Sequence, residues 1–286
     1  NFVQRSTHAR QDPDAPPWPD EQRAGPLEPP SRIPPPAGDV PVQLARTIRP
    51  GRDPDSPDGE QTILDHYRHA FAAATRTIYL ENQHPGEASL LELLERALLR
   101  GVRVVLIVPG EPMPAIIRAR RDVAALAADG RRDAHRYGPT FARLDALARH
   151  PGFTLAALAR SDPAPSGGWT HREIYTHAKL CIVDGEWATL GSANLVDLSL
   201  DRDHTELNAS FRHKAQCLDL LRSLVAEHTD RDVPADDIGA LDLITRLARA
   251  SRDSLLAGGP VLGGCYALDP ARYALDPPLT SRERGA

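Results

Sequence analysis

A histidine and a lysine two residues apart form the first candidate for chemistry in this sequence. The segment from His177 to Asp184 reads His-Ala-Lys-Leu-Cys-Ile-Val-Asp. Alternation along a strand would put His177 and Lys179 on the same face, so that an imidazole and an ammonium point into one site. A neutral imidazole can attack phosphorus, and an ammonium stabilises the negative charge that gathers on phosphoryl oxygens. The pair therefore indicates chemistry on a phosphate ester.

Polar residues further along the chain could complete such a site. The run Gly191-Ser192-Ala193-Asn194 would supply a tight backbone turn, a hydroxyl and a carboxamide, all of which can bind phosphate oxygens. Glu206 is a candidate to accept the second ring N–H of the histidine and thereby fix its tautomer. Asn208, two residues later, is a further candidate for substrate binding.

The specificity of this pattern comes from the combination of residues. A lone histidine in an apolar strand is more often structural than catalytic, whereas the full set of residue types at these spacings is a strong signal. Only Lys179 and Lys214 are lysines among the 34 basic residues, so a compact ammonium stands at 179 in a chain that otherwise uses arginine. Asp184 precedes a glycine at an expected turn, and it is as compatible with forming that turn as with supporting the site.

The elements expected around these residues alternate between helix and strand. Apolar residues at helical spacing predict helices over 61–74, 89–100, 114–129, 139–150, 218–227 and 238–256. Apolar and β-branched runs predict strands over 40–48, 77–80, 102–108, 153–158, 174–176, 179–183 and 187–190. Asp184-Gly185 is expected to turn the last two strands into a hairpin, and the tail after Gly258 is expected to be loop-like. An α/β fold follows from this alternation.

Composition bounds the function classes. A net charge of -5 argues against a broad basic surface and hence against nucleic acid as the partner. No apolar run approaches the roughly 20 residues that span a bilayer, so any membrane contact is expected to be peripheral. The cysteines at 181, 217 and 265 lack metal-ligand spacing and are too scattered for a disulfide framework, so we expect buried or idle thiols.

Together these residues resemble the motif of the phospholipase D superfamily, His-x-Lys-x4-Asp with a trailing Gly-Ser-x-Asn. The segment Ile78 to Gln83, which reads Ile-Tyr-Leu-Glu-Asn-Gln, is similar to the strand that opens the second catalytic half of phosphatidylcholine-hydrolysing phospholipases D. A looser likeness runs through residues 101–109 to Ala226-Glu227-His228 and covers most of the chain from about residue 40. The resemblance implies a mixed sheet flanked by helices that forms one catalytic half.

The resemblance also implies a mechanism. Two such motifs meet across a pseudo-twofold axis, where one histidine forms a phosphohistidine intermediate and the other protonates the leaving alcohol, without a metal or another cofactor. By this resemblance, His177 would be one of the two histidines, and Lys179 and Asn194 would be phosphate ligands. Ser192 would be a supporting donor, Glu206 would be the partner of His177, and Gln83 would lie near the pocket rim.

Among the departures from the family pattern, two concern histidines. The sequence holds no second motif, because His8-Ala9-Arg10 and His213-Lys214 fail in spacing or residue type. In addition, His84 stands where the family usually has an aromatic residue after Glu-Asn-Gln, and its loop position predicts a solvent-exposed side chain.

We expect three regions and a chain that is part of a longer protein. Residues 1–60 read as a Pro-rich connector and lead-in, 61–230 as the catalytic domain with one motif, and 231–286 as a C-terminal helical and loop extension. The chain starts at Asn1 without a methionine, and residues 1–5 resemble the connector that follows the first motif in such enzymes. This start leaves the compartment open, with the cytoplasm slightly favoured and secretion still allowed.

The leading hypothesis is a phosphodiesterase that hydrolyses or transfers phospholipid head groups at a membrane surface, with a missing N-terminal catalytic half as its partner. A second hypothesis is a single-motif phosphodiesterase or nuclease that builds its site from two copies of itself across a twofold axis. A third is an inactive half that serves as an interaction module.

Overall fold

The computed structural model describes residues 31–32, 35, 38–53 and 55–279, so the connector expected at residues 1–5 lies outside them. The described strands are β1 (Val42–Ile48), β2 (Glu60–Gln61), β3 (Thr77–Asn82), β4 (Arg103–Ile107), β5 (Phe153–Pro163), β6 (Trp169–Ile174), β7 (Lys179–Val183), β8 (Trp187–Gly191), β9 (Glu206–Arg212) and β10 (Cys265–Leu268). The described helices are α2 (Thr62–Ala73), α3 (Ala88–Leu99), α4 (Pro114–Ala128), the 3-10 helix η2 (Arg132–Ala134), α5 (Gly138–Leu147), α6 (Asp197–Leu200), α7 (Lys214–Thr229) and α8 (Asp237–Leu256).

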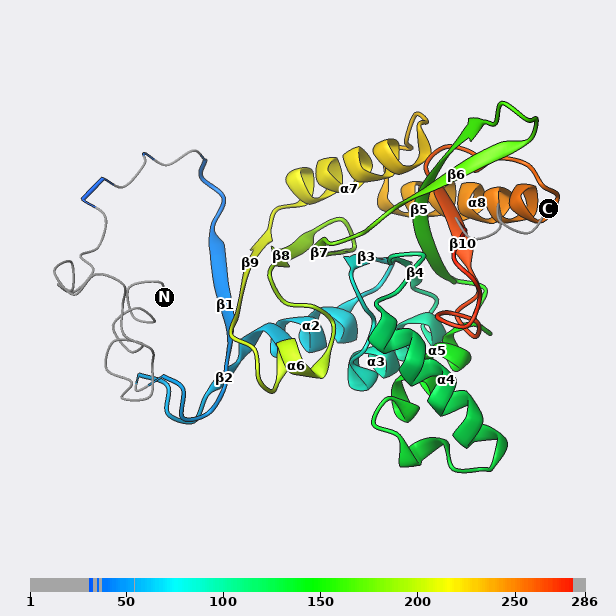
Figure 1. The fold of residues 1–286 in the computed structure, drawn as a ribbon. Helices are drawn as coiled ribbons and strands as arrows, with labels where there is room; N and C mark the ends of the chain where they lie inside the picture. The colour runs from blue at the N-terminus through cyan, green and yellow to red at the C-terminus, as the bar shows by residue number, and fades with distance from the viewer. Residues whose placement is uncertain (1–30, 33–34, 36–37, 54, 280–286) are drawn as a thin grey trace, which may run out of the picture.

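All the described strands belong to one mixed sheet (Figure 1). Its order is β10-β5-β4-β3-β7-β8-β9-β1-β2, with β6 attached to β5. Strands β3, β4 and β5 run parallel, because helices α3, α4 and α5 carry the chain back between them. The other neighbouring pairs are antiparallel. The expected α/β fold with a mixed sheet flanked by helices is confirmed.

Alternate side chains of the sheet pack into two helical layers. In β3, Ile78 and Leu80 join the core formed with α2, α3, α4 and α5, whereas Tyr79 joins the core formed with α7 and α8. Figure 1 shows these two groups of helices on opposite faces of the sheet. Because β3 is buried on both faces, its apolar residues Ile78 to Leu80 follow one another instead of alternating with polar residues.

Strand directions gather the candidate residues at one edge of the sheet. Since β3, β7, β8 and β9 are antiparallel in turn, the end of β3 lies beside the start of β7, and the end of β8 lies beside the start of β9. The register pairs Asn82 with Lys179 and Gly191 with Asn208. We call this edge the site edge.

The structure differs from the strand predictions at β6, β9 and β10. Residues 174–176 were expected to form a strand, but β6 begins earlier, at Trp169, and ends at Ile174. Strand β9 was not predicted, because its inward positions hold polar residues such as Asn208 and Ser210 instead of apolar ones. The tail after Gly258 was expected to be loop-like, but it contains β10, which is too short to show a period.

The segment after residue 230 contributes helix α8 and strand β10 to the fold. Helix α8 packs on the face of β3 and β5 that holds Tyr79, and β10 pairs with β5. The cysteines are buried thiols, as expected. Among the described helices, none has the length and apolar composition to cross a membrane.

Candidate functional site

The histidine of the motif lies just before β7 instead of within it. Strand β3 ends at Asn82, which pairs with Lys179, so no strand remains opposite His177 for it to pair with. The expectation of both residues on one strand was therefore wrong. The two nevertheless stay in contact, because Lys179 Nζ donates a hydrogen bond to the backbone oxygen of His177 at 2.9 Å. The imidazole itself is exposed at the site edge.

A tyrosine that the sequence did not single out holds this region together. The ring of Tyr175 stacks on the His177 ring with centroids 6.3 Å apart. Its hydroxyl accepts a hydrogen bond from Gln83 Nε2 at 2.7 Å, and Gln83 Oε1 accepts one from Asn194 Nδ2 at 3.3 Å. The expected rim residue Gln83 thus links the segment that carries the histidine to the Gly-Ser-Ala-Asn loop.

The Gly-Ser-Ala-Asn loop rests on two buried carboxamides. Asn208 Oδ1 accepts from the Ala193 amide at 3.3 Å, and Asn82 Oδ1 accepts from the Leu195 amide at 3.0 Å. A Cβ at Gly191 would lie 2.2 Å from the Leu207 carbonyl oxygen, so a larger residue does not fit there. Asn208 therefore positions the loop from below, fully buried, rather than facing an open site.

Glu206 lies at the start of β9, next to the loop. Its carboxylate accepts a hydrogen bond from Ser192 Oγ at 2.5 Å and lies 3.4 Å from His204 Nδ1. In the part of the chain that the structure describes, these two residues are its partners, and its pairing with His177 stays a prediction. Glu206 also acts on Lys179: partial burial lowers the pKa of the lysine, and the nearby carboxylate opposes this shift.

Asp184 lies at the opposite end of β7 from the histidine. Its carboxylate accepts hydrogen bonds from the backbone amides of Thr75, Arg76 and Thr77 and from the Thr75 hydroxyl. Its φ of 54° and the following glycine at 60° form the expected hairpin turn. The structure therefore does not bring Asp184 together with the other candidate residues; it ties the turn to the start of β3.

Asp184→Asn is expected to lower stability by about 1–3 kcal/mol at neutral pH, because charge-assisted hydrogen bonds are lost, and to leave turnover per folded molecule unchanged. Burial raises the pKa of Asp184, but the amides of Thr77, Thr75 and Arg76 outweigh it and lower the net pKa below 3.8. The stabilisation is therefore fully present above the ordinary pKa of 3.8, and it is lost as the pH falls through the lower pKa of the folded protein. Urea unfolding of the wild type and the variant should show a difference in the free energy of unfolding, and this difference should become smaller in acid. Normal stability with lost turnover would instead make Asp184 part of the site.

His84 is buried, and the expectation of an exposed side chain was wrong. Only 2% of it is exposed, because Gly86 packs beside it and the Tyr137 ring covers it edge-on, with ring centroids 6.1 Å apart. Within the described residues, neither ring nitrogen has a hydrogen-bond partner. Burial lowers the pKa of this imidazole to about 4.

His84→Phe is expected to make the protein less sensitive to acid. The unfolded chain takes up a proton near the ordinary pKa of 6.5 and the folded chain only near 4, so this histidine costs stability as the pH falls between these values. Between pH 7 and 4.5, His84 should lower the free energy of unfolding of the wild type by about 2–3 kcal/mol. The variant should not show this part of the loss. The measurement is urea unfolding at both pH values, with the exposed His69→Phe as the matched control. An unchanged pH dependence in His84→Phe would contradict this account.

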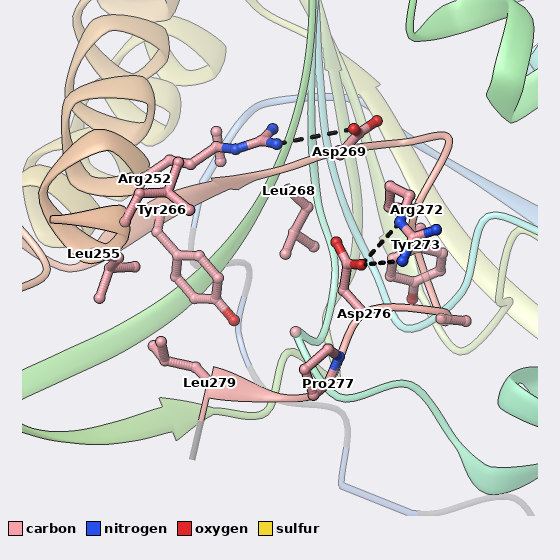
Figure 2. Close-up of a pocket in the computed structure, with 14 residues that line it drawn as sticks. Arg252, Leu255, Tyr266, Leu268, Asp269, Arg272, Tyr273, Asp276, Pro277 and Leu279 are labelled. Carbon is pink, nitrogen blue, oxygen red and sulfur yellow. Dashed lines mark hydrogen bonds and ion pairs between the residues drawn. The ribbon is translucent and has the colours of Figure 1, made fainter. Parts of the chain in front are cut away.

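A cavity of about 120 Å³ lies beside β10, between α8 and the last described residues (Figure 2). Its walls include Arg252, Tyr266, Tyr273 and Asp276, and none of the predicted site residues lines it. The carboxylates of Asp269 and Asp276 pair with Arg252 and Arg272.

His177, Gly191 and Ser192 are exposed at the site edge. Within the described ranges, no three His, Cys, Asp or Glu side chains gather to hold a metal ion.

Comparison with known proteins places this motif in a family. A family model described as the PLD-like domain of cardiolipin synthase matches residues 67–226. The chain is similar to Nuc, a phospholipase D family member from Salmonella typhimurium, with 18% identity and a TM-score of 0.39 over 65% of this chain and 91% of that one. NucT from Helicobacter pylori is 14% identical, with a TM-score of 0.39 over 63% and 91% of the two chains. TrmBL2, an archaeal chromatin protein, is 14% identical, with a TM-score of 0.35 over 66% and 51%. No curated protein matches the chain by sequence.

Proposed function

Because the chain belongs to the phospholipase D-like family, whose model covers more than half of it, we propose that it is a phosphodiesterase acting on phospholipid head groups. It hydrolyses the head-group ester or transfers the phosphatidyl group to an alcohol. The observation that carries the proposal is the gathering of an exposed imidazole, an ammonium, a hydroxyl and a carboxamide at one edge of the sheet. These are the groups that a phosphoryl transfer needs.

In the proposed reaction, His177 attacks phosphorus while Lys179 and Asn194 stabilise the charge on the phosphoryl oxygens. The bond from phosphorus to the head-group oxygen breaks, and the leaving alcohol takes a proton from a general acid. Water or another alcohol then gives its proton to the conjugate base of that general acid, attacks the phosphohistidine and releases the imidazole. The Tyr175 ring and the ammonium hold the histidine segment in place for both steps.

The general acid has to come from outside this motif, since the sequence holds a single His-x-Lys pair. Its absence would remove a contribution of about 10²- to 10⁴-fold. A second catalytic half, supplied by a longer chain or by a second copy, would contribute the missing imidazole. The open site edge supports this proposal, because an isolated half leaves its histidine in solvent.

An exposed apolar strip beside the site edge supports the same proposal. It consists of Val42, Leu44, Leu190 and Leu207, which are 55%, 65%, 45% and 38% exposed. Leu44 and Leu190 both lie opposite Ala209, so the strip crosses β1, β9 and β8 on one face of the sheet. Exposed apolar patches of this kind on soluble proteins mark interaction sites. We propose that the second half packs on this strip.

The test is turnover in EDTA together with the mass in solution. Bis(p-nitrophenyl) phosphate, phosphatidylcholine vesicles and single-stranded DNA serve as substrates. Turnover of the vesicles supports the proposed substrate class, whereas turnover of DNA alone favours the nuclease hypothesis. A folded monomer inactive on all three would mean that the chain is one half of an enzyme or an interaction module.

The mass decides which partner completes the site. Activity at the mass of two copies points to a homodimer, and then Leu44→Arg should separate the copies and remove turnover. Leu99→Arg is the matched control, because Leu99 is 73% exposed at the end of α3, outside the apolar strip. Loss of the dimer in both variants would overturn the assignment of the interface to the strip.

A further inference from the structure

A carboxylate and an imidazole are buried together at the site edge, on the face of the sheet covered by α7. Glu81 on β3 and His228 near the end of α7 are each 6% exposed. Glu81 Oε1 lies 3.1 Å from His228 Nε2 and accepts a hydrogen bond from the Tyr79 hydroxyl at 2.7 Å. Both residues belong to segments that the sequence singled out, Ile78 to Gln83 and Ala226 to His228, and neither has a role in the mechanism above.

Three consecutive residues at the end of β3 hold three different parts of the molecule. Glu81 binds α7 on one face of the sheet. Asn82 faces the other way, and its Oδ1 accepts from the amides of His84 and Leu195. Gln83 joins Asn194 to Tyr175. The position of this strand end therefore sets the positions of the loop and of the histidine segment together.

We propose that Glu81 and His228 form a positioning pair, which locks the end of β3 onto α7 and so places the phosphate-binding loop. Its consequence for turnover rests on the proposed function. A buried polar pair suits this task because it has few acceptable geometries, whereas an apolar contact at the same place could slide. A displacement of the strand end by about 1 Å would move Asn82 and Gln83 and could slow turnover by about 10²-fold.

If the pair acts in this way, a substitution in α7 should loosen a loop on the opposite face of the sheet. His228→Leu removes the partner of the carboxylate, and His228→Gln keeps a nitrogen donor at the same reach. The matched control is Thr245→Val, which breaks the 3.1 Å contact between Thr154 and Thr245, another link between a helix and the sheet. Hydrogen exchange at the His84 and Leu195 amides reports directly on Asn82, and steady-state kinetics report on the site.

His228→Leu is expected to speed exchange at both amides by at least about 10-fold and to lower kcat about 10- to 100-fold, with KM nearly unchanged. His228→Gln should restore both readouts, and Thr245→Val should leave them at wild-type values. If His228→Leu does not fold, Glu81→Gln is used, with a smaller change in the same direction.

Unchanged exchange at the two amides in a folded His228→Leu overturns the positioning pair. So does an equal change in Thr245→Val, since that would reflect general destabilisation. If the isolated wild type turns over no phosphodiester, the kinetic readout is lost with it, and the exchange data still decide the pair on their own.

Discussion

His177→Asn is expected to abolish phosphodiester turnover while leaving the fold intact. The imidazole is the nucleophile of the proposed reaction, Lys179 Nζ is bonded to the backbone oxygen of the same residue, and asparagine cannot form a phosphoamino-acid intermediate there. Removing the nucleophile of an enzyme that works through a covalent intermediate costs on the order of 10⁴-fold or more. The measurement is kcat/KM for bis(p-nitrophenyl) phosphate in EDTA.

The exposure of this histidine makes the result easy to interpret. Surface substitutions away from special features change stability by about 0.5 kcal/mol or less, so the unfolding midpoint of His177→Asn should match the wild type. His69→Asn is the matched control, because His69 is exposed on α2 and lies outside the site. A His177→Asn variant with wild-type turnover would overturn the mechanism.

Lys179→Met is expected to lower kcat/KM about 10²- to 10³-fold, the usual cost of losing one preorganised donor to a developing negative charge. Methionine keeps most of the volume of the lysine stem, so the change removes the charge and little packing. Lys214→Met is the matched control: it changes the other lysine of the chain, which is exposed and pairs with Glu186 on the surface. Equal losses in the two variants would contradict a local role for Lys179.

The pH profile gives a second test of the same residue. Burial lowers the pKa of Lys179 despite Glu206, so the ammonium should lose its proton below the ordinary value of 10.5. Turnover should therefore fall on the alkaline side of the profile earlier than an exposed lysine would allow. Lys179→Arg, which stays charged at these pH values, should lose this alkaline limb and keep part of the activity, because a planar guanidinium does not reproduce a compact ammonium.

The sequence predicted those helices and strands in which the spacing of apolar residues matches the face that is buried. Leu90, Leu91, Leu94 and Leu98 mark one face of α3, and the burial of that face confirms the prediction. The hairpin between β7 and β8 follows from Asp184-Gly185, because both positions need positive φ. Strand β9 could not be predicted in this way, since Asn208 and Ser210 point inward and are satisfied by contacts with Thr189, a residue distant in sequence.

The sequence alone identified the candidates for chemistry. The types and spacing of His177, Lys179, Ser192, Asn194 and Glu206 predicted phosphate chemistry, because few combinations of side chains suit it. The sequence could not decide whether Asp184 belongs to the site, because a residue in a turn and a residue in a site look the same in one dimension.

Tertiary structure decided what each polar residue touches. The strand register put Asp184 at the far end of β7 and Asn82 opposite Lys179. The packing of distant segments buried His84, joined Tyr175 to Gln83 and brought Glu81 to His228. The physical reason is that side-chain periodicity reports burial and local turns, whereas hydrogen-bond partners far apart in sequence depend on how the strands are ordered in the sheet.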